Sequence, residues 1–273
     1  MKSLFAAMIT VLLISGSGFS QYKLEYKASG STPIHYKSHT TLERTESVMG
    51  QTARVSLISD QTISMTSKKS GGDLVYLIKI DSSENVAVMP NGDTSRSSSP
   101  TLGKLKETRI HPNGDQISSR WLDTAFAQSQ AGEAKDNGSF FIKLPGKEVG
   151  KGSTWNQLKV DTIGTPGTAG SLIINTTTGY KFVDEEKFDG TPCARIDFTG
   201  QVALQGSTAA QGMEVAIKGN GTISGSVLFD YTNGKIMKIK GKSDQDVTMS
   251  SSGSHPVSVP MNQKTDYDLL LIR

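Results

Sequence analysis

The chain has 273 residues, of which 35% are hydrophobic and 20% charged, and its formal net charge at pH 7 is +3. A small charge with both signs mixed along the chain excludes a strongly basic surface, so we predict no nucleic-acid partner. The single cysteine, Cys193, cannot form a disulfide within the chain. We predict that Cys193 is a small, partly buried side chain at the start of a strand. The alternatives are a reactive thiol or a disulfide between chains.

The first twenty residues have the pattern of a secretory signal peptide. A lysine precedes the apolar run 4–14, and small residues then lead to Ser20, after which we predict cleavage. The run is too short to span a membrane, no later segment is apolar enough to do so, and no lipoprotein cysteine follows the cleavage point. The sequence thus predicts a periplasmic or secreted chain, 21–273, forming one domain.

Apolar and polar residues alternate through most of 22–90 and again through 140–273. This period of two is typical of β-strands, and several runs are far longer than the about five or six residues of an ordinary strand. Strands of that length must coil. We therefore predict an all-β fold with one short helix. Its long, curved antiparallel sheet forms a half-barrel, barrel or deep sandwich built from two similar halves.

Near the start of the first half, His35, His39 and Glu43 are spaced four residues apart, which on a helix would suit a metal ion. The surrounding pattern has period two, so on a strand adjacent members are separated by ~13 Å. One ion cannot bind residues that far apart. We predict no metal site and no cofactor.

The segment 91–139 differs from both halves, and we predict a connector of loops and one helix. Its polar stretch 91–100 cannot form a core. Within 120–132, Trp121, Leu122 and Phe126 recur at helical spacing before Gly132. This pattern predicts a helix with one narrow apolar stripe that packs on the sheet.

The stretch "FFIKLPGKEVGKGSTWNQ", 140–157, combines a Leu-Pro pair with a Val-Gly-x-Gly-x-x-Trp motif. These residues are Leu144, Pro145, Val149, Gly150, Gly152 and Trp155. The arrangement resembles a turn in a family of exported all-β proteins of bacteria such as the Bacteroidetes, as do the stretches "LEYK" and "FDYTNGKI". The resemblance implies an exported β protein. Physically, the tryptophan should begin a strand as a large core anchor.

A hairpin is predicted around an Asn-Gly pair late in the chain, because both residues tolerate positive φ. With a two-residue loop, Val227 and Phe229 would face lysines. With a three-residue loop in which Gly234 is a left-handed bulge, Phe229 faces Met237 and Val227 faces Ile239. The second register keeps one face apolar, so we predict the bulged turn.

Small residues interrupt the apolar face of this hairpin, where the predicted register sets Gly225 opposite Gly241 and Ile223 opposite Ser243. Gly200 lies at a similar place in its own strand. Such a gap can mark a bend in a long sheet, can be filled by a bulky side chain from a second layer, or can hold a ligand. Strand glycines are usually architectural, which favours the first two explanations.

The hairpin "FDYTNGKIMKIKGK" is also distantly similar to those of bacterial lipoprotein-carrier and lipid-binding half-barrels, whose curved sheets hold acyl chains. We accordingly predict a non-catalytic exported binding or carrier protein for an apolar, lipid-like ligand of the cell envelope. The predicted ligand-binding residues are Val227, Phe229, Met237, Ile239, Gly241, Val247 and Met249, with Trp121 and Phe126 as a cover.

The alternative is a structural or protein-interaction module of the envelope, with a filled core and another envelope protein as its partner. A hydrolase would need a polar cleft in which acids or a histidine converge. The sequence contains no nucleophile elbow, phosphate loop or metal signature. We therefore predict no catalytic residues.

Overall fold

We describe a computed structural model of the chain at residues 21–48, 50–129, 140–164, 170–210, 213–252 and 256–272. The leader predicted over 1–20 lies outside the described residues. The elements of the first part are β1 (Tyr22–Lys23), β2 (Gly30–Val48), β3 (Gln51–Ser70), β4 (Asp73–Val88), β5 (Thr94–Ser97), β6 (Leu105–Ile110), β7 (Gln116–Trp121) and α1 (Thr124–Ser129). Those of the second part are β8 (Glu148–Val149), β9 (Thr154–Gly164), β10 (Ser171–Phe188), β11 (Thr191–Ala210), β12 (Met213–Asp230), β13 (Lys235–Ser251) and β14 (Val257–Ile272).

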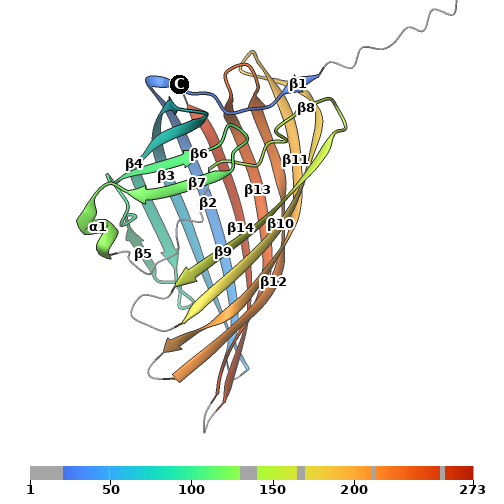
Figure 1. The fold of residues 1–273 in the computed structure, drawn as a ribbon. Helices are drawn as coiled ribbons and strands as arrows, with labels where there is room; N and C mark the ends of the chain where they lie inside the picture. The colour runs from blue at the N-terminus through green and yellow to red at the C-terminus, as the bar shows by residue number, and fades with distance from the viewer. Residues whose placement is uncertain are drawn as a thin grey trace, which may run out of the picture.

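Strands from both parts of the chain form one antiparallel sheet of 12 strands. Its order is β7-β6-β4-β3-β2-β14-β13-β12-β11-β10-β9, with β5 also paired to β4. The strands curve around a common interior, and the two ends of the order, β7 and β9, do not pair with each other (Figure 1). The predicted all-β fold, a long curved antiparallel sheet forming a half-barrel, is confirmed.

The long strands explain the curvature of the sheet. β3 and β11 have 20 residues each, which at ~3.3 Å per residue corresponds to roughly 66 Å. Along the lower part of β13, half-buried residues on the concave face alternate with exposed residues on the convex face. Because a right-handed twist accumulates over such lengths, the sheet coils, and one face becomes concave.

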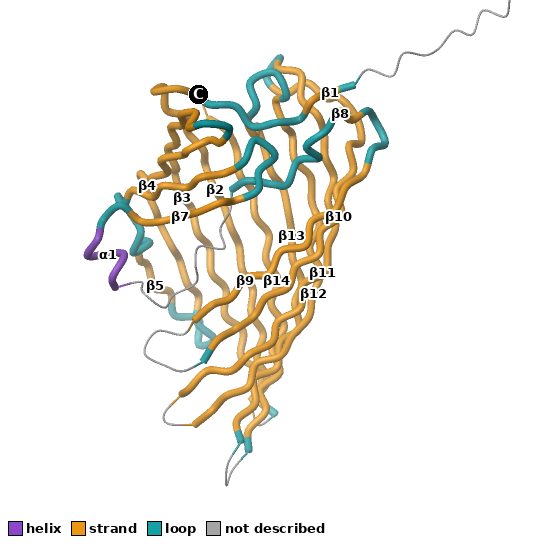
Figure 2. The backbone as a smooth tube through the Cα atoms, in the orientation of Figure 1, coloured by secondary structure: helices purple, strands orange, loops and turns teal. Residues whose placement is uncertain are grey.

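The upper part of the concave face is covered by chain segments that cross it (Figure 2). We call this cover the cap: residues 21–29, the β6–β7 hairpin and residues 140–150. Leu24, Tyr26, Ile110 and Leu144 of the cap are buried in one hydrophobic cluster with side chains of the long strands. The protein core therefore lies under the cap, and the lower concave face lies outside it.

Tyrosine and tryptophan side chains tie the cap to the sheet. The hydroxyl of Tyr26 accepts a hydrogen bond from the backbone N–H of Ile142 at 2.9 Å. Trp155 Nε1 donates to the carbonyl of Lys143 at 2.8 Å, and its ring stacks on Tyr180 with centroids 5.7 Å apart. Trp155 thus lies near the start of a strand and packs against the core edge, as the motif predicted.

Where the sequence predicted loops and a helix over 91–139, the described residues form three strands, β5, β6 and β7, beside the helix. β6 buries Lys106, Thr108 and Ile110. Because two of these three inward residues are polar, the strand lacks the alternation of apolar and polar residues that would predict it. The described helix begins at Thr124 rather than Arg120, because Trp121 ends β7. Asp123 caps the helix by accepting a hydrogen bond from the N–H of Phe126.

Buried tyrosines make the stability of the core depend on alkaline pH. Burial raises the pKa of Tyr36 and Tyr26 well above the usual 10.0, and raises the pKa of Tyr76 to about 12. The folded state therefore keeps protons that the unfolded chain releases. We expect the free energy of unfolding to be constant below about pH 9 and to fall above about pH 10, by ~1.4 kcal/mol per pH unit for each such tyrosine.

Urea unfolding at several pH values between about 8 and 11.5 measures this slope. Tyr36→Phe removes one titrating group together with its hydrogen bond to the carbonyl of Ile236. This variant should be less stable at neutral pH and should show a shallower alkaline slope. An alkaline slope equal to that of the wild type would exclude Tyr36 as a source of the effect.

Candidate functional site

The β12–β13 hairpin has the predicted pairing beyond its turn. Val227 faces Ile239, and Gly225 faces Gly241. At the turn the prediction was wrong: Phe229 faces Ile236 instead of Met237, because the strand irregularity falls between Leu228 and Phe229. The turn spans 231–234, with Gly234 at φ 65°. The buried carboxylate of Asp230 accepts hydrogen bonds from the N–H groups of Thr232 and Asn233, which stabilises this longer turn.

Four of the predicted ligand-binding residues lie in the core under the cap. Val227 and Phe229 have no exposed surface, while Met237 and Ile239 are 3% and 7% exposed. The ring of Phe229 makes an edge contact with Tyr26 of the cap, with centroids 5.3 Å apart. These side chains are covered by protein in the structure.

The gap in the apolar face is filled by neighbouring side chains. A Cβ atom at Gly241 would lie 2.2 Å from Cζ of Tyr267, and one at Gly225 would lie 2.6 Å from Cζ of Phe198. A Cβ atom at Gly200 would lie 2.9 Å from Cγ1 of Ile223. The glycines therefore make room for side chains of adjacent strands in the same sheet, rather than for one from a second layer. At Gly225 and Gly200 the backbone oxygens of Lys240 and Thr177 lie closer still, at 2.1 Å and 2.5 Å.

The other predicted residues fall in two separate places. Val247 and Met249 lie half-buried on the lower concave face of β13. Trp121 and Phe126 contact each other edge to face at the opposite side of the sheet, near β4 and β6. Figure 1 places α1 at the far side from β12 and β13, so the predicted cover does not lie over the predicted lining.

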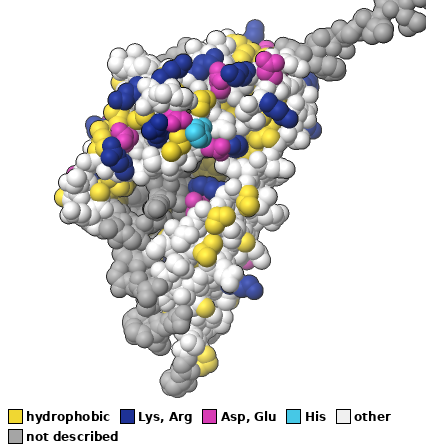
Figure 3. Space-filling view, in the orientation of Figure 1, with side chains coloured by type: hydrophobic (Ala, Val, Ile, Leu, Met, Phe, Trp, Pro, Cys, Tyr) yellow, Lys and Arg dark blue, Asp and Glu magenta, His cyan; other side chains and the backbone are white. Residues whose placement is uncertain are grey.

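A cavity of about 750 Å³ lies on the concave side, where the cap ends. Its apolar lining comes from Phe141, Ile142, Tyr180, Phe198, Ile223 and Tyr267, and Leu158 and Val160 of the edge strand β9 also border it. Its polar lining includes Asp115, Gln116, Gln157, Lys159, Asp161 and Thr178. Figure 3 shows the hollow directly below the cap.

Much of the polar lining comes from β9, on which Gln157, Lys159 and Asp161 lie on the concave side. Lys159 and Asp161 are partly buried on the concave side and form an ion pair at 3.0 Å. Leu158 and Val160 are 71% and 58% exposed. Trp155 explains this orientation: its stacking on Tyr180 directs odd-numbered side chains inward. The cavity thus combines an aromatic and aliphatic floor with one charged side.

The tyrosines of this lining are neutral over the physiological range. Burial raises the pKa of Tyr180, and it raises the pKa of Tyr267 to about 12. The hydroxyl of Tyr180 donates to Oε1 of Gln157 at 3.0 Å. The cavity therefore offers hydrogen-bonding groups and one ion pair beside its apolar floor, an arrangement that suits an amphipathic molecule.

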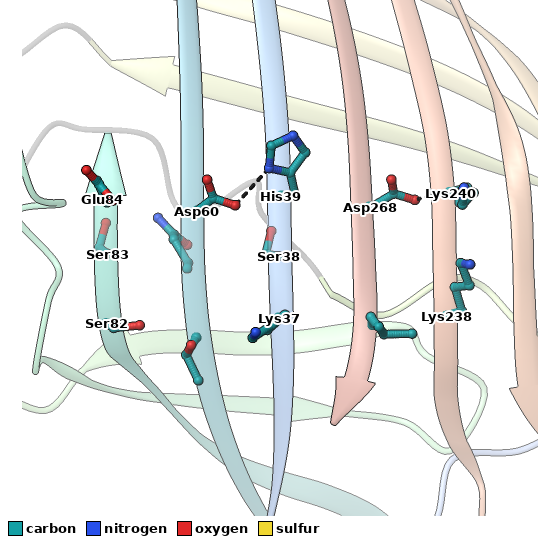
Figure 4. Close-up of a pocket in the computed structure, with 13 residues that line it drawn as sticks. Lys37, Ser38, His39, Asp60, Ser82, Ser83, Glu84, Lys238, Lys240 and Asp268 are labelled. Carbon is teal, nitrogen blue, oxygen red and sulfur yellow. Dashed lines mark hydrogen bonds and ion pairs between the residues drawn. The ribbon is translucent and has the colours of Figure 1, made fainter. Parts of the chain in front are cut away.

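A second hollow, of about 640 Å³, lies on the convex face across β13, β14, β2, β3 and β4 (Figure 4). Two ion pairs lie in it: Nδ1 of His39 lies 2.7 Å from Asp60, and Lys240 lies 3.9 Å from Asp268. Such exposed pairs contribute little to stability. This mixed surface gives no preference for one class of ligand.

The histidines near the start of the chain are directed to separate partners. His39 pairs with Asp60, whereas His35 lies 4.0 Å from Asp81. Glu43 instead pairs with Arg54. In the part of the chain that the structure describes, no group of three or more His, Cys, Asp or Glu side chains is arranged to hold a metal ion.

Cys193 is fully buried near the start of β11, one residue after Pro192. Burial, reinforced by the neighbouring Asp230, raises the pKa of its thiol to about 11. At neutral pH the group is a protonated, inaccessible thiol, and the thiolate is the reactive form. This position fits the predicted structural role of Cys193. It disfavours both a reactive thiol and a disulfide between chains.

Comparisons with known proteins identify no family. No protein-family model and no curated protein matches the sequence. Among solved structures, Neisserial surface protein A aligns with 87% of this chain and 97% of its own, at 6% identity and a TM-score of 0.23. OccK2 (OpdF) of Pseudomonas aeruginosa aligns with 90% of this chain and 100% of its own, at 6% identity and a TM-score of 0.28.

A third solved structure, the COG4313 outer membrane channel from Pseudomonas putida F1, aligns with 91% of this chain and 98% of its own. Its identity is 7% and its TM-score 0.25. At this level of similarity, function must be argued from the residues of this chain. Among the described residues, no helix is long and apolar enough to cross a membrane.

Proposed function

We propose that the protein is a non-catalytic binding or carrier protein for an apolar, lipid-like ligand. One observation carries the proposal: the cavity of about 750 Å³ below the cap, with its aromatic and aliphatic floor. Small-molecule sites combine apolar side chains with a few convergent polar groups. This cavity presents aromatic and aliphatic side chains beside a larger polar lining. The leader pattern of residues 1–20 supports export to the periplasm or the medium.

The lower concave face supplies further surface for the ligand. Below the cavity it carries half-buried apolar side chains from several strands: Leu42, Val55, Leu57, Ile174, Leu204, Ile217, Val247, Met249 and Met261. Methionine and branched aliphatic side chains adapt to flexible chains without hydrogen bonds. In this proposal the apolar part of the ligand lies along the concave face, and its polar end lies beside Lys159 and Asp161.

Ile223→Asp tests the site, because it places a carboxylate in the apolar floor. We expect the affinity for a fluorescent naphthylamine dye to fall by roughly tenfold or more, since burying a charge against an apolar ligand is unfavourable. Ile58→Asp is the matched control, because Ile58 is 37% exposed and lies on the convex face. Equal dye affinity in the two variants would show that the ligand does not bind in the cavity.

Native mass spectrometry of protein purified from its own cell envelope, followed by lipid extraction, identifies the natural ligand. A stoichiometric lipid mass is expected. A ligand-free mass, together with no dye binding by the wild type, would contradict the carrier proposal.

A structural or protein-interaction module is the second candidate function. The observation that favours it is the packing of Val227, Phe229 and Ile239 under the cap, where the sequence placed a ligand. Under this proposal the hollow below the cap binds neither lipid nor dye, and a protein partner is recovered from the same envelope preparation instead.

A further inference from the structure

The strand β9 is a long free edge of the sheet. Within the described ranges it pairs with β10 alone, from Thr154 opposite Lys181 to Gly164 opposite Ser171. Among the described residues its outer backbone groups have no strand partner, and such a row can pair with another strand. Figure 2 shows this edge facing the opening of the half-barrel.

The convex side of this edge is apolar. Leu158 is 71% exposed and Val160 is 58% exposed, and Ile173 on the adjacent strand β10 is 41% exposed. Figure 3 shows hydrophobic side chains along the strands below the cap. Proteins blunt a free edge with outward or inward charges or by keeping the edge strand short, and β9 carries charges only on its concave side. The opposite edge follows that rule, because β7 has only six residues and includes the exposed Arg120.

The concave side of β9 carries one positive and one negative charge two residues apart. In an antiparallel pair of identical strands, a two-fold axis through Val160 would set Lys159 of each copy opposite Asp161 of the other. Opposite charges at facing positions stabilise a strand pair, whereas like charges destabilise it.

The neighbouring two-fold registers are less favourable. An axis through Lys159 would set the two lysines opposite each other. An axis through Asp161 would set the two aspartates opposite each other. A slip by a single residue would turn the apolar side of one copy toward the charged side of the other. Among these registers, the charge pattern of β9 favours the one with the axis through Val160.

We infer that β9 is a homodimerisation strand, which pairs antiparallel with β9 of a second copy about an axis through Val160. The pair joins two sheets edge to edge and brings Leu158 and Val160 of both copies into one apolar patch on the convex side. It also places the two concave cavities side by side, because Lys159 and Asp161 line the cavity of each copy.

Disulfide trapping tests the register. In the Cys193→Ala background, Val160→Cys places two thiols at the axis, where facing Cα atoms are ~4.5–5.5 Å apart and within disulfide range. Asn156→Cys is the matched control, since it is exposed on the same side of β9. In the proposed register its two copies lie roughly 26 Å apart. We expect the first variant to form a covalent dimer under mild oxidation and the second to stay monomeric.

Sedimentation velocity of the full chain tests the charge pairing. Lys159→Asp should weaken dimerisation by roughly tenfold, because it sets two aspartates opposite each other. The double variant Lys159→Asp/Asp161→Lys should restore wild-type dimerisation, since the facing charges are again opposite. Circular dichroism verifies that each variant is folded.

Three outcomes would overturn the inference. These are a wild-type chain that stays monomeric at millimolar concentration, trapping of Asn156→Cys in preference to Val160→Cys, and a charge-swapped variant that dimerises no better than Lys159→Asp. Dye binding by the cavity is measured separately, so neither result decides the other.

Discussion

Gly241→Ala is expected to lower the free energy of unfolding by about 1–3 kcal/mol, the usual cost of adding a methyl group to a filled space. The added Cβ atom would lie 2.2 Å from Cζ of Tyr267, a separation that real Cβ atoms do not show. The obstacle is an aromatic ring opposite it in the register of β13 and β14. Either the ring leaves its place or the strands move apart, and urea unfolding measures the cost.

A double-mutant cycle separates the ring contact from the general effect of replacing a glycine. In a Tyr267→Ala background the same Gly241→Ala change should be nearly neutral, because the ring is gone. Gly179→Ala is the matched control. This glycine also lies within a strand, but its added Cβ atom would meet only Asn156 Oδ1 at 3.3 Å and Thr199 O at 3.8 Å. Additive costs in the cycle would show that Tyr267 does not fill the gap at Gly241.

Asp230→Ala is expected to cost about 3 kcal/mol, since it removes three hydrogen bonds to a buried carboxylate. The Asp230 carboxylate is fully buried and accepts hydrogen bonds from Thr232 N, Asn233 N and Asn233 Nδ2. The turn that it holds also contacts the cap, because Gly234 O accepts a hydrogen bond from Lys27 N at 3.1 Å. Thermal and urea unfolding of the full chain measure the loss.

The control for Asp230 is a similar turn on the surface. Asn91 Oδ1 accepts a hydrogen bond from Asp93 N at 3.1 Å, and both residues are exposed. Asn91→Ala should cost under about 1 kcal/mol, because water can replace the lost bond. Equal losses at the two turns would show that burial of Asp230 adds nothing to its effect.

Alternation and turn chemistry predict most of the sheet from sequence. The parity of Val227, Gly225 and Ile239 fixes the β12–β13 register, because a one-residue slip would expose the apolar face. The length of the alternating runs predicts the curvature of the sheet, since strands of this length must coil. The cap is harder to predict because its buried positions include polar residues such as Lys106 and Thr108, which periodicity treats as exposed.

Two physical reasons separate the predicted ligand-binding residues from the cavity. Apolar side chains on a concave face mark either a ligand surface or a core, and only the crossing of the cap decides that Phe229 belongs to the core. On β9, hydrophobicity favours Leu158 and Val160 as inward residues, whereas the stack of Trp155 on Tyr180 turns them outward. The shared parity of Trp155, Lys159 and Asp161 is the signal in the sequence that could have shown it.

The pairing of β2 with β14 has a consequence for the order of folding. These strands join over a register from His35 opposite Ile272 to Glu46 opposite Met261, so contact between them closes almost the whole described chain into a loop. Loop closure of that length costs entropy before any contact is gained, and such long-range pairings slow folding. The sheet becomes continuous only once β14 docks. Until then β2 and β13 are both open edges, at which misfolding and aggregation begin.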